Sequence, residues 1–300
     1  ITPNSEYFFL PTRFSVPIGD EYVGLDEFSD KYKGVMSAVK PDFENKKLDM
    51  AFQVILPPWS YDLSDAGKGI SDGWAFLSTY NTEEAITTLE INASQNERDY
   101  IVLFNWREIE EQVENGNYKE INGVKMFDPV EYPGSVYLIP VPKSPHGVDV
   151  TPDGAHFIAS GKLSPTTSMY SFEKALEAIE NADFKGEAQG LPILTYENVI
   201  EKEVEVGLGQ LHTHFADQGF AYTTLFIDSQ VVKWHLETGE VVDKVDVHYA
   251  PGHLATVEGD TMKPGGHWAV SVNKSSNDRY LPVGPSHPES IDLIDISGEK

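Results

Sequence analysis

Three histidines occur in the same local order along the chain, and imidazole is the side chain best suited to build a metal site here. His146, His212 and His253 each stand ahead of a turn that leads into a run of strand-forming residues. The turns are Pro152–Gly154, Asp217–Gly219 and Pro264–Gly266, and the runs are Ala155–Ser160, Phe220–Ile227 and Trp268–Val272. Neutral imidazole nitrogen suits transition metals such as copper, and equivalent placement of three imidazoles makes a shared metal site as good an interpretation as structural or surface histidines.

Two further histidines compete for these positions. His214 lies two residues after His212, and residues two apart in an extended segment face the same side, so geometry alone does not separate them. His287 is the second choice to His253, because the run Ile291–Ile296 follows it without the turn that the three units share. The other histidines are interpreted as packed or solvated residues in or near predicted strands: His156, His235, His248 and His267.

The units that carry these histidines have the pattern of β-propeller blades. Short strands separated by turn signals, recurring at roughly 40–50 residues, are typical of such blades, and the longer interval between His146 and His212 needs an inserted loop. If the blades are radial, residues at one equivalent position point to one end of the central channel. We therefore expect an all-β fold, a partial β-propeller of about four to five blades that forms one domain over residues 1–300.

Helices are expected only as short excursions between strands. Asn105 is a capping residue ahead of the predicted helix Trp106–Glu114, and a second helix is predicted at Ser171–Ala182. Further predictions are a helical turn at Asn81–Ala85, strands at Asp49–Leu56 and Gly73–Thr79 in the middle of one blade, a strand at Ile101–Phe104, and irregular loops with a single strand at most over Ile1–Asp42.

The segments around the three histidines closely resemble a known enzyme family. SPHGVDVTPDG, GLGQLHTHF, AYTTLFIDSQVVKW, YAPGHLAT and DRYLPVGPSHPE are similar to nitrous oxide reductase, the copper enzyme of denitrification. The resemblance implies a seven-bladed propeller whose hub holds CuZ, a tetranuclear copper-sulfide centre with seven histidine ligands. Three ligand positions match His146 in SPHG, His212 in LHT and His253 in PGHL, and the other four lie outside this chain. The family places its ligand directly after Leu, which favours His212 over His214.

The same resemblance implies the reaction and its partners. Nitrous oxide is reduced to dinitrogen and water with two electrons and two protons, and the electrons arrive through CuA, a dinuclear copper centre in a C-terminal cupredoxin domain. That domain uses cysteine ligands and is absent from this cysteine-free chain. The family is periplasmic, works as a homodimer, and receives electrons from a cytochrome c or a small copper protein. With three of seven ligands, this chain alone is expected to be inactive.

A calcium site is a second expectation from the resemblance. Tyr80, Glu83 and Asp99 by themselves read as a solvated acidic loop, although calcium does bind carboxylates in loops. The family holds a structural calcium with a Tyr-x-x-Glu pair, a carbonyl, an Asp in an Arg-Asp step, and an Asn two residues before a CuZ histidine. Tyr80, Glu83 and Asp99 match, whereas Ser144 replaces the Asn and the intervening loop is longer.

Composition excludes several classes of partner and site. A formal net charge of −26 argues against nucleic acid, which requires clustered Lys and Arg, and suits a basic electron donor. The absence of cysteine excludes disulfides and thiolate metal sites within the chain. No apolar run approaches the ~18–20 residues of a membrane span. The start at Ile1 and the end just after a predicted strand indicate an internal fragment.

Two other classes of function remain open from the residues alone. One is a non-catalytic propeller that binds a protein or glycan, in which the histidine-turn-strand units only mark where blades begin and have no chemical role. The other is a calcium-dependent propeller hydrolase. The first predicts no metal dependence, and the second predicts a central carboxylate site without copper.

Overall fold

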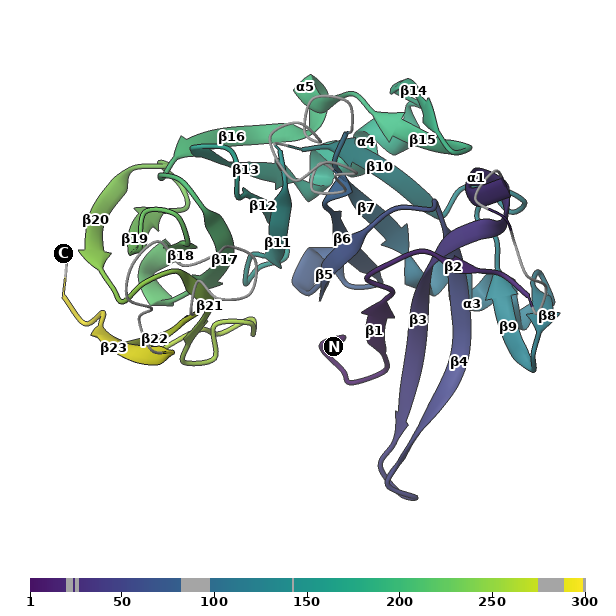
Figure 1. Cartoon of the computed structure of the whole chain (residues 1–300), viewed down its shortest axis with the longest axis horizontal. Coiled ribbons are helices and arrows are strands. Elements are labelled where there is room, and N and C mark those ends of the chain that lie inside the picture. Colours follow the sequence, from purple (N-terminus) through teal and green to yellow (C-terminus); the bar gives the residue numbers. More distant parts are fainter. Residues whose placement is uncertain (20–23, 25–26, 82–97, 142, 275–288, 299–300) are drawn as a thin grey trace.

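The computed structural model describes residues 1–19, 24, 27–81, 98–141, 143–274 and 289–298, whose strands form five sheets (Figure 1). The first sheet has the order β1-β3-β4-β9-β8, with β2 paired to β3. Its strands are β1 (Phe8–Pro11), β2 (Val16–Pro17), β3 (Tyr32–Asp42), β4 (Lys47–Leu56), β8 (Lys119–Ile121) and β9 (Val124–Phe127). The ends of β3 and β4 project as a hairpin whose tip exposes Phe43.

The second sheet begins the series that carries the candidate site. Its order is β14-β15-β10-β7-β6-β5, so β5 is an edge strand. The strands are β5 (Tyr61–Ala66), β6 (Trp74–Thr79), β7 (Tyr100–Asn105), β10 (Val136–Pro140), β14 (Phe184–Ala188) and β15 (Leu191–Leu194). The β5-β6-β7-β10 part is antiparallel throughout, whereas β10 and β15 pair in parallel.

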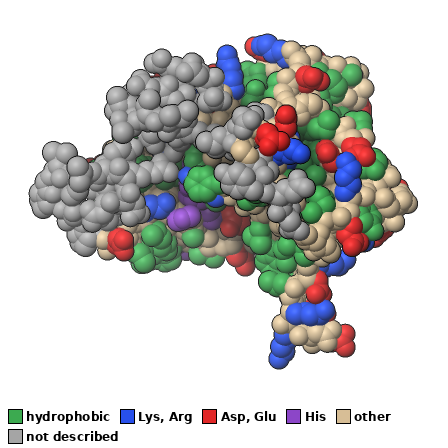
Figure 2. Space-filling model, turned by 45° about the vertical axis from the view of Figure 1, so that its right-hand side comes forward, with side chains coloured by type: hydrophobic (Ala, Val, Ile, Leu, Met, Phe, Trp, Pro, Cys, Tyr) green, Lys and Arg blue, Asp and Glu red, His purple; other side chains and the backbone are tan. Residues whose placement is uncertain are grey.

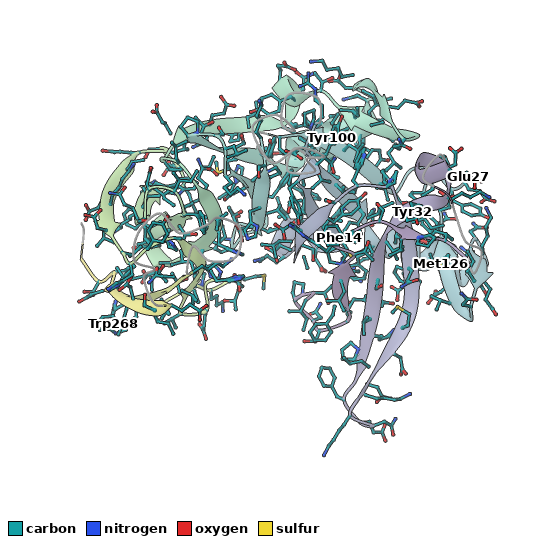
Figure 3. All side chains as sticks on the ribbon, viewed as in Figure 1. Phe14, Glu27, Tyr32, Tyr100, Met126 and Trp268 are labelled. Atoms are coloured by element: carbon teal, nitrogen blue, oxygen red, sulfur yellow. The ribbon has the colours of Figure 1, made fainter. Side chains whose placement is uncertain are left out.

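Three antiparallel sheets follow in chain order, and each begins at an edge with the strand that bears a predicted ligand. Their orders are β11-β12-β13-β16, β17-β18-β19-β20 and β21-β22-β23. The strands are β11 (Pro145–Val150), β12 (His156–Gly161), β13 (Thr166–Ser171), β16 (Ile200–Glu205), β17 (Gln210–Phe215), β18 (Phe220–Leu225), β19 (Gln230–His235), β20 (Val241–Asp246), β21 (Pro251–Thr256), β22 (Trp268–Asn273) and β23 (Ser290–Asp295). Figure 3 shows Trp268 of the last sheet at the edge of the molecule, far from Tyr100 of the second sheet.

Four apolar clusters lie between successive sheets, which is the packing of propeller blades. Alternate residues of one strand enter different clusters: Leu77 of β6 packs toward the first sheet, and its neighbour Phe76 packs toward the third. Trp234 joins the third and fourth sheets, and Leu254 joins the fourth and fifth. Because the second, third and fourth sheets are covered on both faces, their strands share a radial arrangement in which their inner edges meet.

Helices are short, as expected. They are α1 (Phe28–Lys31), α3 (Trp106–Glu114), α4 (Phe172–Glu180) and α5 (Tyr196–Val199), with 3-10 turns at Gly69–Ser71 and Asp217–Gly219. The side chains of Asn105 and Ser171 accept hydrogen bonds from the backbone of the first turns of α3 and α4. The predicted cap at Asn105 therefore forms, and Ser171, which was predicted as the first helical residue, caps α4 instead. No helix in the described part of the chain is long and apolar enough to cross a bilayer.

Three local expectations were wrong. Residues 1–42 contain β1, β2 and the eleven-residue β3 rather than mainly loops, because β3 is a buried run that lacks the alternation of a half-exposed strand. Strands β4 and β6 lie in different sheets rather than in the middle of one blade. The segment around His212 is itself the inner strand β17, whereas only the run after its turn was predicted to form a strand. The helical turn predicted at Asn81–Ala85 falls largely outside the described residues.

Candidate metal centre

The inner strands of four successive sheets are interrupted at the same place. The pairing register shifts between Tyr61 and Ser64 in β5, between Pro145 and Val148 in β11, between Gln210 and Thr213 in β17, and between Pro251 and Leu254 in β21. At each shift the inner strand advances by three residues while its neighbour advances by two. Such an extra residue on one strand is a β-bulge. A bulge re-aims a side chain that regular pairing would place on a sheet face.

The three predicted ligands lie in three of these bulges and come together. The ring centroids of His146 and His212 are 5.0 Å apart and perpendicular, and those of His212 and His253 are 4.5 Å apart at 36°. His212 therefore contacts both of the others, across three different sheets. Histidine side chains are gathered at one place on the face shown in Figure 2.

The backbone enters each histidine strand in the same way. Ser144, Gly209 and Ala250 directly precede the three strands and have positive φ angles of 56°, 87° and 54°. This left-handed conformation is uncommon for residues other than glycine. Its recurrence at Ser144 and Ala250 shows that the turn before the ligand is a repeated part of the blade.

Close contact between neighbouring inner strands requires glycine at position 147. A Cβ on Gly147 would lie 2.2 Å from the carbonyl oxygen of Leu211, the residue before His212. That oxygen belongs to the backbone and has no freedom to rotate away. Gly147 thus lets the strands of His146 and His212 approach each other.

Hydroxyl groups of the second strands hold the ligand backbone. Ser78 Oγ donates to the His146 carbonyl oxygen at 2.7 Å, and Thr224 Oγ1 donates to the Gly252 carbonyl oxygen at 2.8 Å. Thr224 Oγ1 also accepts the backbone N–H of His212 at 3.2 Å. Thr224 therefore links the strand of His212 to that of His253.

Two histidines of the cluster, His212 and His253, favour the neutral form that binds metals. Burial, followed by the nearby charges of His146 and His253, lowers the pKa of His212 to about 2. Burial and then Lys274 also lower the pKa of His253. The Nε2 atoms of His146 and His212 are buried and have no hydrogen-bond partner among the described residues. Since a buried polar atom without a partner is costly, these nitrogens fit the ligand role.

The arrangement of the three histidines differs from that of a site for one metal ion. Among the described residues, no group of three or more His, Cys, Asp or Glu side chains is arranged to hold a single metal ion. The cluster instead forms a chain in which His212 contacts both His146 and His253. Imidazole donors without thiolate suit copper or zinc, so the donor set alone does not select between them.

Asp62 occupies the fourth bulge and was missed by the sequence reasoning. Its Oδ2 contacts Nδ1 of His146, and its Oδ1 lies 3.4 Å from Nη1 of Arg13. A carboxylate on Nδ1 fixes the tautomer that leaves Nε2 free. The available signal was the same unit with Asp in place of His, since Asp62 precedes the turn-rich segment Gly67–Asp72 and strand β6.

The predicted calcium ligands are only partly described. Glu83 lies outside the described residues. The hydroxyl oxygen of Tyr80 is buried without a hydrogen-bond partner among them, and the guanidinium carbon of Arg13 stands 3.4 Å over the Tyr80 ring. Asp99 is 3% exposed, and its carboxylate accepts the backbone N–H of Ser144 at 2.7 Å. Ser144 is therefore hydrogen-bonded to Asp99 through its backbone N–H. The Tyr80 hydroxyl oxygen, buried without a partner among the described residues, is suited to bind a cation.

A cavity of about 590 Å³ opens beside the histidines. It is lined by residues from four inner strands and from the N-terminal segment, among them His212, His253, His214, Asp65, Asp149 and Asp260. Acidic side chains are visible beside the histidines in Figure 2. The cavity gives small molecules access to His212 and His253, the two predicted ligands that line it.

The other described histidines make different contacts. His214 Nδ1 lies 3.4 Å from Asp260 Oδ1, and no ring contact joins His214 to the cluster. His248 pairs with Asp292 on the surface, His235 packs on Phe220, and His156 begins β12 with a pKa lowered by burial. His267 is exposed. His287 lies outside the described residues.

Comparison with known proteins identifies close relatives. Residues 244–300 match the family described as the nitrous oxide reductase propeller repeat. The chain is 37% identical to the nitrous-oxide reductase of Stutzerimonas stutzeri and 38% identical to that of Pseudomonas fluorescens, in both cases over 99% of its length. It covers 46% of each of these proteins, so it spans about half of their length.

Solved structures are similar in fold. The periplasmic gluconolactonase of Pseudomonas aeruginosa superposes with a TM-score of 0.53 over 99% of this chain and 71% of that chain, at 13% identity. Because the sequence identity is so low, this similarity shows only that the fold is shared. With the propeller-repeat match and the five packed sheets, the predicted all-β propeller is confirmed.

Proposed function

The chain is related over 99% of its length to the nitrous-oxide reductases, and we propose that it supplies the propeller part of such an enzyme, an oxidoreductase that reduces nitrous oxide to dinitrogen and water in denitrification. The observation that carries the proposal is the meeting of His146, His212 and His253 in equivalent bulges of three sheets. Three residues so far apart in sequence come together only if the repeated blade plan places them.

The three histidines would hold copper of a copper-sulfide cluster. Two of their Nε2 atoms are buried without partners, and the low pKa of His212 keeps its ring neutral, so copper binds there without first displacing a proton. Copper held there would supply the electrons for the reduction. The relatives select copper over zinc, which the imidazoles alone do not.

The chain's own groups orient these ligands. Asp62 accepts the Nδ1 proton of His146, which leaves the Nε2 lone pair of that ring for the metal. Ser78 and Thr224 fix the backbone of the ligand strands. The cavity beside His212 and His253 admits a molecule as small as nitrous oxide.

A structural calcium is the second element of the proposal. Tyr80, Glu83 and Asp99 would bind it, with the buried Tyr80 oxygen as one ligand. Because Asp99 also binds the backbone of Ser144, two residues before His146, calcium would stabilise the entrance to a ligand strand. The Ser144 side chain replaces the amide that the family uses.

The complete enzyme requires more than this chain. We propose that the remaining CuZ histidines and a cupredoxin domain with CuA belong to the rest of the protein. We further propose that the protein is a periplasmic homodimer that takes electrons from a cytochrome c or a small copper protein. The present chain, with three ligands, is expected to be inactive alone.

Metal analysis of the full-length protein tests the proposal. We expect copper together with acid-labile sulfide, and reduction of nitrous oxide with a chemical reductant. The variant His212→Ala should lose copper and the cluster's absorption, whereas Asp243→Asn, on the exposed outer strand β20, should keep both.

The two rival functions predict other results. A non-catalytic propeller would contain no copper and would keep its stability in His212→Ala. A calcium-dependent hydrolase would contain calcium but no copper or sulfide. Either result would replace the proposed function.

A further inference from the structure

A second layer of ionisable side chains lies one step further along the inner strands. Regular pairing with the neighbouring strand resumes after each bulge. The second residue of this resumed pairing is Asp65 in β5, Asp149 in β11 and His214 in β17. All three line the cavity that His212 and His253 also line. The blade plan therefore sets acid and base groups beside the candidate metal centre, and the proposed function has not used them.

Asp149 is held between two ligand strands. Its Oδ2 accepts the backbone N–H of Thr213, the residue after His212, at 3.0 Å. No described residue donates a hydrogen bond to its Oδ1. The carboxyl group thus has one fixed oxygen, and the other is free to carry a proton in a cavity open to a small substrate.

The charges that surround Asp149 come from every neighbouring element. Asp65 accepts the backbone N–H of Val150 at 2.8 Å, and Lys68 Nζ lies 3.7 Å from Asp65. Lys68 also donates to the carbonyl oxygen of Asp260 at 2.8 Å, and Asp260 faces His214. His212 and His253 line the same cavity, and desolvation lowers the pKa of both rings.

This surrounding favours a protonated carboxyl. Burial and then the negative charge of Asp65 raise the pKa of Asp149 well above its usual value, and Asp260 acts in the same direction. The Thr213 N–H and Lys68 oppose the rise. Lys68 already has two oxygen partners in Asp65 and Asp260, so its charge is shared.

We propose that Asp149 is a catalytic proton donor for nitrous oxide reduction in this cavity. The proposal rests on the proposed function. The reaction takes up two electrons, which an external redox protein supplies, and two protons. The N–O bond breaks, the oxygen leaves as water, and dinitrogen is released. One proton of that water comes from the O–H of Asp149, whose carboxylate then regains a proton from solvent in the cavity. The second proton follows by the same route.

The test measures turnover of the copper-loaded full-length protein against pH. In wild type, the rate should fall as pH rises through the pKa of Asp149, because only the protonated acid donates. Asp149→Asn keeps the shape but has no acidic proton, so turnover should drop roughly 100-fold with copper content unchanged, the scale of general acid catalysis. The alkaline fall in rate should also disappear. Asp243→Asn, exposed on β20, is the matched control.

A second variant separates proton donation from a structural role. Asp65→Asn removes the negative charge that helps to raise the pKa of Asp149, so the alkaline fall should move to lower pH. If Asp149→Asn fails to load copper, the Asp65→Asn profile decides the matter. An unchanged profile overturns the proposal, as does wild-type turnover in copper-loaded Asp149→Asn. A wild-type protein that contains no copper or does not reduce nitrous oxide overturns the proposed function itself.

Discussion

Replacing Asp62 tests the link between the fourth bulge and the copper ligands. Asp62→Ala removes the carboxylate that contacts Nδ1 of His146, so the ring is no longer held in the tautomer with Nε2 free. Loss of such a partner lowers metal affinity by about 10–100-fold in other metal sites. This range corresponds to about 1.4–2.8 kcal/mol of binding free energy.

Two milder variants should have smaller effects than Asp62→Ala. Asp62→Asn keeps an oxygen that can accept the Nδ1 proton but loses the charge, so its effect should lie near 10-fold. The ion pair of Asp62 with Arg13 is partly exposed, with side chains 18% and 38% accessible, and such pairs contribute about 0–1 kcal/mol. Arg13→Gln should therefore weaken copper binding by less than about 5-fold.

The assay is competition for copper(I) between the full-length apoprotein and a chelator of known affinity, without oxygen. We expect the order wild type, Arg13→Gln, Asp62→Asn, Asp62→Ala from tightest to weakest. Equal affinity in wild type and Asp62→Ala would refute the role of Asp62. An Arg13→Gln loss as large as that of Asp62→Ala would show that the ion pair matters more than the tautomer.

Three other predictions concern pH, packing and calcium. The folded pKa of His212 is about 2, below the ordinary value of 6.5, so below pH 6.5 the unfolded chain takes up a proton that the folded chain does not. As pH falls from 6.5, the free energy of unfolding of the metal-free wild type should decrease by about 1.4 kcal/mol per pH unit more than that of His212→Asn, measured by denaturant unfolding. Equal pH dependence of the two proteins would contradict this. Gly147→Ala should destabilise the protein by about 1–3 kcal/mol and reduce copper loading, because its Cβ would meet the Leu211 carbonyl oxygen, and an unchanged Tm would contradict the contact. Calcium removal by a chelator should lower Tm, since calcium at 100 times its Kd contributes about 2.7 kcal/mol, and Asp99→Asn should abolish this response; a Tm indifferent to the chelator would exclude the site.

The repeat of histidine, turn and strand predicted the units whose histidines meet, and the family resemblance was needed to prefer His212 to His214. Each unit maps onto a real sheet, with His146, His212 and His253 in its inner strand. Strand periodicity alone did not separate His212 from His214, because a period of two places both on one face. The bulge before Thr213 separates them, and a bulge leaves no clear mark in the residue types.

Other parts of the site were beyond the sequence reasoning for physical reasons. Asp62 was overlooked because the sequence pattern was defined by histidine alone. The fold repeats the bulge position in each sheet, and the residue type at that position varies. Strand β3 was missed because burial on both faces removes the alternation that marks a strand. The acidity of Asp149 depends on Asp65, which is distant in sequence and close only in the folded ring.

Anomalous X-ray scattering at the copper edge, from crystals of the full-length protein, tests the central claim most directly. We predict copper peaks about 2 Å from ring nitrogens of His146, His212 and His253, the usual metal–imidazole distance. Copper bound elsewhere, with these three rings free of metal, would contradict the proposed centre.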